Sequence, residues 1–367
     1  MNIRDIARLA GVTPGTVSKV LNNYPDISTA TRQHVLQIIT ENQYDPKANV
    51  KNAKAAPEST RICLVVEAVY NEVYEWMERN LSKDFHNAGY CIAGFHDNFY
   101  IQDKQEKFNE LLAYLERDKI SSLLYLGGNY AQLGLQQLGR LPCPTVFINT
   151  VLPLGGEGSL YSSLQTNHYP CAQAQMQMLV DAGHRDIATV ISSPDDISIY
   201  GLRQQAYRTV LTEAGLRHNL DYFLECRYMP DRTYQQLKAL LEQHPEITAV
   251  CCQADIMLPG VLRAIRDVQR TPGEDVAVVS FDGLETTAYS IPSVTTFAQP
   301  YKEMTDYAQQ LMIGLLKGDR EHQCITFNSK FIQRESFYLQ TKTEPGRNIP
   351  GSVFIFTSNR RIYINCS

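Results

Sequence analysis

The chain has 367 residues, and its 34 basic and 39 acidic side chains give it a formal charge of −5. Hydrophobic residues make up 44% and charged residues 20%, which is typical of a globular protein, and the length predicts two or three domains. No apolar run approaches the roughly 18–20 residues that a membrane span requires, and the first residues lack the apolar stretch of a signal peptide. We therefore expect a cytoplasmic protein without a membrane partner.

The nine cysteines are scattered along the chain, with no Cys-x-x-Cys pair and no histidine at zinc-finger spacing. Most of them lie in apolar runs, such as the run that ends at Cys251 and Cys252, where cysteine packs as a small hydrophobic residue. We expect no disulfide framework, no metal site and no cofactor.

Charge is distributed unevenly along the chain. Residues 1–60 carry seven basic and five acidic side chains, so the negative charge belongs to the remainder. A basic segment attached to an acidic body is typical of a polyanion-binding module, although a solvated surface could give the same count.

The beginning of the chain predicts three short helices. The first has an apolar stripe and ends at Gly11, because glycine enters the left-handed conformation at little cost. Thr13 caps the second helix, and Pro14 follows at a position where the missing N–H of proline costs nothing. Ser28 caps a third helix that closes the core. Two short helices joined by a tight glycine turn and closed by a third predict a helix-turn-helix.

The exposed side of the second helix carries small hydroxyl residues and one lysine, namely Thr16, Ser18 and Lys19. This composition suits a DNA groove, because small side chains permit close approach and hydroxyl groups can bond phosphates. A generic three-helix bundle is the alternative interpretation.

Residues 3–22 have the sequence IRDIARLAGVTPGTVSKVLN, and this segment resembles the head of the lac repressor/galactose repressor family of bacterial transcription regulators. The resemblance continues without gaps to the Tyr44-Asp45-Pro46 segment. It implies that the second helix enters the major groove, where Lys19 stands in the place of a common arginine and could donate to a guanine edge. The head positions that it implies for DNA binding are Thr13, Pro14, Gly15, Thr16, Ser18, Lys19 and Asn22.

Residues 45–60 are polar and rich in alanine, lysine and asparagine, a composition typical of an interdomain linker. In the family, this stretch forms a hinge helix on DNA, and a leucine inserts into the minor groove. The corresponding position here is Ala53, which the resemblance places among the DNA-binding residues. Alanine is too small to unstack a base step effectively, so we expect less DNA kinking.

From Arg61 onward, buried strands alternate with helices, and the alternation restarts after Tyr169. This pattern predicts two doubly wound parallel sheets, and the core resembles both that of the repressor family and the periplasmic solute-binding proteins. The segment 295–300 is expected to cross back to the first half. The expected organisation is a helix-turn-helix head at 1–44, a hinge or linker at 45–60, a first lobe at 61–167 plus about 296–325, a second lobe at 168–295 plus about 326–338, and an extension at 339–367 with two possible strands and no assigned role.

Ligands of two-lobed α/β proteins lie between the lobes, at the carboxyl ends of the strands. Tyr70 and Tyr74 follow the first strand, and Tyr74 matches a cleft position of the family. Arg203 matches the family arginine that reaches the ligand, with a surface ion pair as the alternative. Asp255 and Asp282 each follow a buried strand, and either could instead cap the next helix. These five residues form the predicted effector site.

Two departures from the family pattern indicate an altered pocket. Thr166-Asn167 stands where an Asp-Asn pair is typical, and Pro259 interrupts a segment that normally begins a helix.

Two classes of function fit these features. The first is a DNA-binding transcriptional regulator, a homodimeric repressor that binds a palindromic operator and the nucleoid and responds to a small-molecule effector, a sugar or related metabolite. The second is a cytoplasmic small-molecule-binding protein or enzyme on the same core, with a non-functional head. The chain contains no G-x-S-x-G, no G-x-x-x-x-G-K-[ST] and no H-E-x-x-H, so we expect the regulator and not an enzyme.

Overall fold

The computed structural model describes residues 3–13, 16–17, 20, 29–41, 60–67, 72–95, 103–155, 160–194, 196, 198–338, 352–357 and 360–365. The chain divides into two compact units, Met1–Ser59 and Thr60–Ser367. Each unit has hydrophobic cores of its own.

The first unit contains the helices α1 (Ile3–Leu9) and α3 (Thr29–Glu41). Between them, Thr16, Val17 and Val20 are helical, as expected for the second helix. Gly11 has the expected positive φ of 64°. The helices enclose a small apolar core made of Ile6, Ala7, Ala10, Val17, Val20, Val35 and Ile38.

The second unit begins with a six-stranded parallel sheet, the first lobe, in the order β11-β5-β4-β3-β1-β2. One face is covered by α4 (Glu72–Asn87) and α12 (Tyr301–Lys317), and the other by α5 (Lys104–Arg117), each over its own apolar core; α6 (Leu135–Leu138) is a short helix of the same lobe. The strands are β1 (Arg61–Glu67), β2 (Cys91–Phe95), β3 (Ser122–Gly127), β4 (Thr145–Ile148), β5 (Ser162–Thr166) and β11 (Cys324–Phe327).

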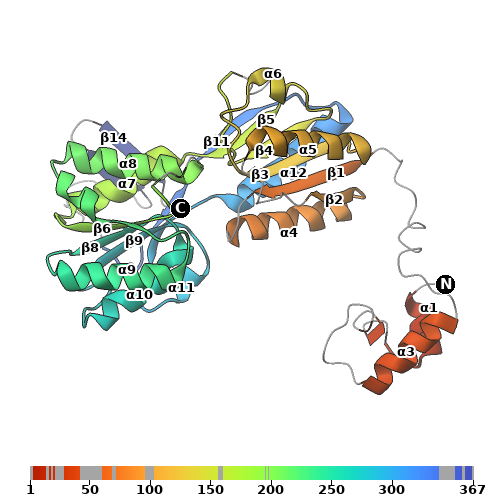
Figure 1. Ribbon diagram of the computed structural model, residues 1–367, viewed down its shortest axis with the longest axis horizontal. Coiled ribbons are helices and arrows are strands. Elements are labelled where there is room, and N and C mark those ends of the chain that lie inside the picture. The colour runs from red at the N-terminus through yellow and green to blue at the C-terminus, as the bar shows by residue number, and fades with distance from the viewer. Residues whose placement is uncertain are drawn as a thin grey trace. The chain divides into compact units, whose positions relative to one another are not determined.

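The second lobe repeats this plan with the strand order β12-β10-β9-β8-β6-β7, in which only β12 is antiparallel. Figure 1 shows α7 and α8 on one side of this sheet and α9 and α10 on the other. The strands are β6 (Ile187–Ile191), β7 (Phe223–Glu225), β8 (Ala249–Cys252), β9 (Ala277–Asp282), β10 (Thr295–Ala298) and β12 (Lys330–Ile332). The helices are α7 (His168–Asp181), α8 (Ile199–Glu213), α9 (Pro230–Gln243), α10 (Leu258–Asp267) and α11 (Thr286–Tyr289), with 3-10 turns at Arg217–Tyr222 and Asp255–Met257.

The chain passes between the lobes after β5, after β10 and after β11. The second passage differs slightly from the expected one, because β10 still pairs with β9 of the second sheet and the crossover follows at Gln299 and Pro300. The other two passages are bonded to each other, since the Asn167 N–H donates to the Phe327 carbonyl at 2.8 Å and the Asn167 side chain donates to Asn328 at 3.3 Å. Three parallel connections of this kind allow the lobes to move as bodies.

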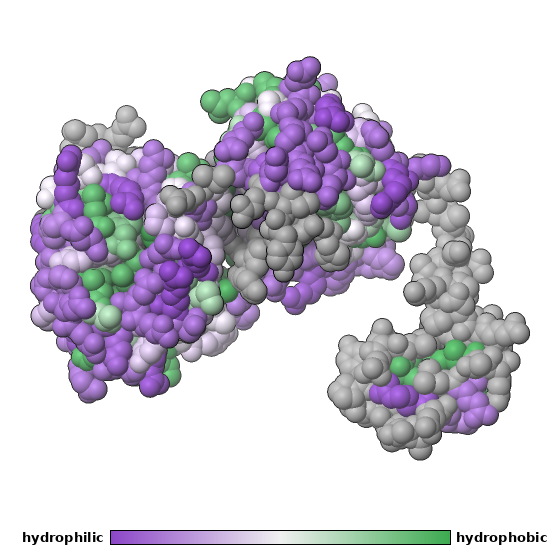
Figure 2. All heavy atoms as spheres, viewed as in Figure 1, coloured by the Kyte–Doolittle hydropathy of each residue, from purple (hydrophilic) through white to green (hydrophobic). Residues whose placement is uncertain are grey.

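The extension contains the two expected strands, β13 (Ser352–Thr357) and β14 (Arg360–Asn365), which pair as an antiparallel hairpin. In the part of the chain that the structure describes, no helix combines the length and the apolar character needed to cross a bilayer. The visible faces of both lobes are mainly hydrophilic, with smaller apolar areas between the polar ones (Figure 2).

Candidate functional site

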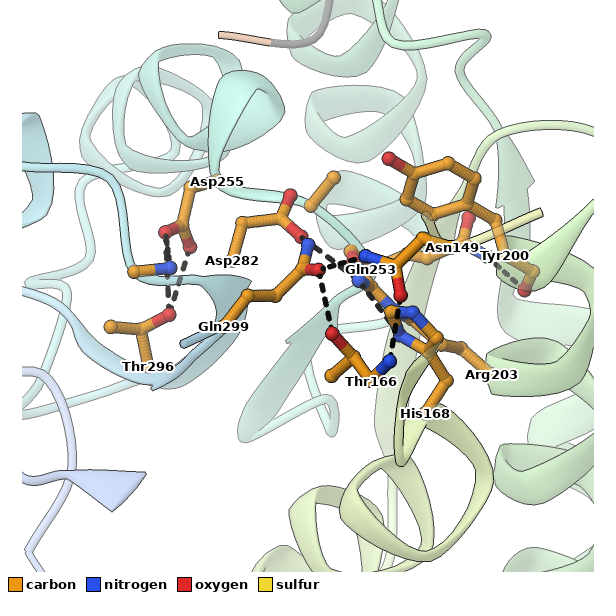
Figure 3. A network of polar contacts seen from close by, with 12 residues as sticks. Asn149, Thr166, His168, Tyr200, Arg203, Gln253, Asp255, Asp282, Thr296 and Gln299 are labelled. Carbon is orange, nitrogen blue, oxygen red and sulfur yellow. Dashed lines mark hydrogen bonds and ion pairs between the residues drawn. The ribbon is translucent and has the colours of Figure 1, made fainter. Parts of the chain in front are cut away.

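Polar side chains gather where strands of both sheets end, near the crossover between the lobes (Figure 3). Asn149 follows β4 of the first lobe, Gln253 follows β8 of the second lobe, and Asp282 is the last residue of β9. Gln299 follows β10 in the crossover itself. The carboxyl ends of parallel strands form the usual binding edge of such sheets, so this cluster is the candidate ligand site.

Arg203, on α8, is the centre of this cluster and has no exposed surface. Its Nη1 donates to the Gln253 carbonyl at 2.6 Å, its Nη2 donates to Asp282 Oδ1 at 2.9 Å, and its Nε donates to His168 Nδ1 at 3.3 Å. The guanidinium carbon lies 3.7 Å from the centre of the Phe281 ring. A guanidinium fixed on four sides is preorganised for recognition by hydrogen bonds. The alternative interpretation of Arg203 as part of a surface ion pair is wrong, because its ion pair with Asp282 is buried.

Asp282 occupies an unusual backbone conformation, with a φ of 119°. Non-glycine residues rarely adopt such values, and they are concentrated at functional sites, where the surrounding structure holds them. The next residue, Gly283, must be glycine, because a Cβ there would lie 2.2 Å from the Cβ of Ala298. Asp282 therefore presents its carboxylate at the end of β9, where Arg203 and the Gln299 amide, at 2.7 Å, both donate to Oδ1.

A chain of hydrogen bonds connects this carboxylate to the first lobe. Gln299 Oε1 accepts from Asn149 Nδ2 at 3.1 Å and from the Thr166 hydroxyl at 3.4 Å. The Thr166 N–H in turn donates to Asn149 Oδ1 at 2.7 Å. Asn149 also has a positive φ, of 50°. Any change in the angle between the lobes must therefore rearrange hydrogen bonds at this site.

Burial and charge have opposite effects on the pKa values of the Arg203–Asp282 ion pair. Burial disfavours the charged form of Arg203, but the adjacent Asp282 carboxylate favours it, and the pKa of Arg203 is raised. Burial raises the pKa of Asp282, while the charge of Arg203 and the hydrogen bonds from Gln299 and Arg203 act in the opposite direction. The pair thus supplies donors and acceptors with no net charge.

Asp255 lies behind this pair and supports the loop after β9. Its carboxylate accepts from the N–H groups of Gly283 and Leu284 at 2.7 and 2.8 Å, and from the Thr296 hydroxyl at 3.1 Å. Burial and the nearby Asp282 charge raise the pKa of Asp255 to about 7. Asp255 is therefore bonded to the backbone beside Asp282 and does not cap the helix that follows it.

The first lobe contributes Tyr74 to the site from α4, with 1% of its surface exposed. Among the described residues its hydroxyl forms no hydrogen bond of standard geometry. Burial is the main cause that raises its pKa, and Arg203, Asp282 and Asn149 are near enough to act on it as well. Tyr70 lies outside the described residues.

Of the predicted DNA-binding residues, Thr13 and Thr16 are described. The Thr16 N–H donates to Thr13 Oγ1 at 3.2 Å, which confirms that Thr13 caps the second helix, and the two hydroxyls are 3.0 Å apart. The predicted positions that lie outside the described residues are Pro14, Gly15, Ser18, Lys19, Asn22 and Ala53.

The two departures from the family pattern have different consequences. Thr166 lies inside the interlobe network, so the substitution at that position alters the site directly. Pro259 lies in the first turn of α10, where a missing N–H removes no helical hydrogen bond, so it leaves the helix intact.

Asn149, Gln253, Gln299 and His168 belong to the site but are not among the residues predicted from the sequence. The first three share the signal that identified Asp255 and Asp282, a polar residue at or just after the end of a buried strand. His168 has no comparable signal, because it begins a helix and reaches Arg203 only through the packing of α7 against α8.

Comparisons with known proteins give a consistent result. Residues 2–47 match the family model of bacterial regulatory proteins of the lacI family, and residues 176–337 match a periplasmic binding protein-like domain. The HTH-type transcriptional regulator MalR of Clostridium butyricum is 26% identical over 92% of this chain and 99% of its own length. Catabolite control protein A of Priestia megaterium is 25% identical over 93% of this chain and 99% of its length. The solved complex of the transcriptional regulator CelR with cellobiose is 25% identical and covers 92% of this chain and all of its own, with a TM-score of 0.62.

A helix-turn-helix head joined to a two-lobed core with a polar interlobe site defines the class of ligand-responsive transcription regulators. The chain therefore combines a head of the lacI family of bacterial regulatory proteins with a periplasmic binding protein-like core. The expected fold class, a small helical head with two doubly wound and mainly parallel sheets, is confirmed.

Proposed function

We propose that the chain is a homodimeric repressor whose binding to a palindromic operator is modulated by a sugar or related metabolite held between the lobes. The observation that carries this proposal is the hydrogen-bonded chain from Arg203 through Asp282 and Gln299 to Asn149. It joins the proposed effector site to the relative position of the two lobes, which is what an effector must change.

The chemistry of the network favours a neutral effector with several hydroxyl groups. Arg203 and Asp282 cancel in charge, and the remaining groups are amides, hydroxyls and a phenol from Tyr74. Hydroxyl groups both donate and accept, so they can replace the bonds that these side chains make to one another. CelR, the relative solved with cellobiose, supports a sugar as the effector class.

In the head, we propose that the N-terminal half of the second helix contacts the major groove. Thr13, Thr16, Ser18 and Asn22 would bond phosphates, and Lys19 would contact a base. Pro14 and Gly15 would allow close backbone approach. We propose that 1–44 is the head, that 45–60 is the linker with Ala53 at the minor groove, and that the protein acts in the cytoplasm on the nucleoid.

One head of this type contacts few base pairs, so specific binding favours two heads on two half-sites. We propose that the core supplies the homodimer surface around α11, where Tyr289 and Ile291 are 77% and 79% exposed. Neighbouring large apolar side chains exposed to this extent are typical of an interaction surface. Within the core, we propose that 61–167 with about 296–325 and 168–295 with about 326–338 form the two lobes, and that 339–367 is an extension to which we assign no role.

Isothermal titration calorimetry on the full chain tests the effector proposal, with a panel of neutral sugars that includes cellobiose. We expect one neutral sugar to bind and Arg203→Gln to weaken its binding by about 10- to 100-fold, since a charged hydrogen bond is lost. Arg208→Gln is the matched control, because Arg208 lies on the same helix but stacks on Phe223. Unchanged sugar binding by Arg203→Gln, or no binding of any neutral sugar by the wild type, would contradict the proposal.

A further inference from the structure

Two buried polar atoms of the interlobe network make no hydrogen bond of standard geometry among the described residues, the Tyr74 hydroxyl and Nε2 of His168. They come from opposite lobes, Tyr74 from α4 and His168 from the first position of α7. The Tyr74 hydroxyl belongs to a residue already assigned to the effector site. His168 is 3% exposed and has no assigned role.

The contacts of His168 define which of its nitrogens carries the proton. Nδ1 accepts from Nε of Arg203 at 3.3 Å and lies 3.3 Å from Nη2. Arginine offers only donors, so Nδ1 must be unprotonated and the proton of the neutral ring is on Nε2. Burial, followed by the positive charge of Arg203, lowers the pKa of His168 well below its ordinary value, so the ring stays neutral.

The position of the ring is fixed by the same groups that fix Arg203. The imidazole centre is 6.0 Å from the centre of Phe281, with the planes 35° apart, and the guanidinium lies on the face of that phenyl ring. Thr166, two residues before His168, is already bonded to Asn149 and Gln299. Figure 3 shows the imidazole next to the Arg203 guanidinium within this network.

A buried donor without an acceptor costs free energy, and such atoms call for a partner that the chain itself does not supply. We propose that His168 is a further specificity-determining residue of the effector site, whose Nε2–H donates to an acceptor oxygen of the bound effector while Nδ1 positions Arg203. This inference rests on the proposed function and deepens it, because it requires an oxygen acceptor on the effector at the second lobe.

Two substitutions separate the two roles of the ring. In His168→Asn, the amide oxygen takes the place of Nδ1, so the contact to Arg203 is kept and the Nε2 donor is removed. In His168→Gln, the amide reaches the Nε2 position, so the donor is kept and the Nδ1 acceptor is lost. A residue that acts only by filling space would leave the penalty for each analogue of the effector unchanged in both variants.

The experiment measures the Kd of cellobiose, or of the neutral sugar that the panel identifies, and of its monodeoxy analogues for the wild type and both variants. In the wild type, we expect one monodeoxy analogue that lacks the accepting oxygen to bind about tenfold more weakly. In His168→Asn, we expect the parent sugar to bind about tenfold more weakly and the penalty for that one analogue to disappear. In His168→Gln, the penalty remains.

The inference is overturned if His168→Asn binds the parent sugar as tightly as the wild type, or if every analogue keeps its wild-type penalty in that variant. If no sugar binds the wild type, the proposed effector class is wrong. The protonation state assigned to His168 is then tested in the unliganded protein. Nitrogen NMR of the ring must then show the neutral Nε2–H tautomer between pH 6 and 8. A charged ring or the Nδ1–H tautomer would refute the assigned donor.

Discussion

Asn149 and Asp282 lie on different lobes, and the side chain of Gln299 bonds to both, accepting from Asn149 at 3.1 Å and donating to Asp282 at 2.7 Å. Both residues have positive φ angles, of 50° and 119°. Two strained residues joined through the crossover form an element with a defined hydrogen-bonded arrangement, and an effector can stabilise or replace that arrangement.

Replacement of Gln299 by leucine removes the hydrogen bonds that its side chain makes to Asn149 and Thr166 in the first lobe and to Asp282 in the second. We expect the effector-induced change in operator affinity to be at least tenfold smaller in Gln299→Leu than in the wild type. The reason is that the effector site is no longer hydrogen-bonded to both lobes. Fluorescence anisotropy of labelled operator with and without effector measures this. The exposed Gln205 on α8 provides the control Gln205→Leu, and equal responses of the two variants would refute the role of Gln299.

Arg203 and Asp282 should behave as a coupled pair in stability. Loss of one partner leaves a buried charge uncompensated, so Arg203→Gln and Asp282→Asn should each destabilise the core by about 3 kcal/mol. The double variant should be destabilised by about 1–3 kcal/mol less than the sum of the two single effects. Urea unfolding of all four proteins measures this, and additive effects would show that the two side chains are independent.

Stability should depend on pH through Asp255. Its pKa is about 7 in the folded core, against about 3.9 in an unfolded chain, so between these values the folded state holds a proton that the unfolded state lacks. The contribution of Asp255 to stability therefore falls as pH rises from about 4 to 7, by up to about 1.4 kcal/mol per pH unit, and is constant above 7. Asp255→Asn should remove this slope.

Urea unfolding between pH 5 and 8 measures the slope of Asp255→Asn. Asp267→Asn is the control, because hydrogen bonds from Tyr234 and Arg263 lower the pKa of Asp267 and it is ionised throughout this range in both states. An unchanged slope in Asp255→Asn would mean that Asp255 is ionised in the folded core at pH 5.

The homodimer proposal places a second copy on α11. Tyr289→Asp should raise the dimer dissociation constant by at least tenfold, since a charge would be buried in an apolar contact. Sedimentation equilibrium measures this constant. Leu154 is 89% exposed in the first lobe, so Leu154→Asp makes the same kind of change elsewhere and should leave the protein dimeric. A dimer that Leu154→Asp disrupts and Tyr289→Asp preserves would move the interface away from α11.

Much of the architecture could be predicted from the sequence, because local signals determine it. Thr13 caps the second helix as its position predicts, and apolar runs give the buried strands on either side of Tyr169. The sequence predicts the crossover a few residues too early, because the composition of β10 would suit either sheet. Its pairing with β9 determines that β10 belongs to the second sheet.

The site could be predicted only in part. The family match predicts Arg203, and the rule that carboxylates after buried strands face ligands predicts Asp282. Whether Arg203 is paired at the surface or in the interior depends on the packing of Phe281 beneath it, which lies 78 positions along the chain. The contact between His168 and Arg203 likewise exists only because α7 packs against α8, so no local sequence pattern predicts it.

The central claim is that a ligand between the lobes controls DNA binding by the head. The most direct test selects bound sequences from random duplex DNA with the full-length protein, then titrates that DNA with and without the effector at about 50 and 200 mM salt. We predict a short palindrome bound by a dimer, an affinity that falls steeply with salt, and a shift in affinity with effector that needs about 10- to 100-fold more effector in Arg203→Gln. Sequence-independent binding, or an affinity that the effector leaves unchanged, would contradict the account.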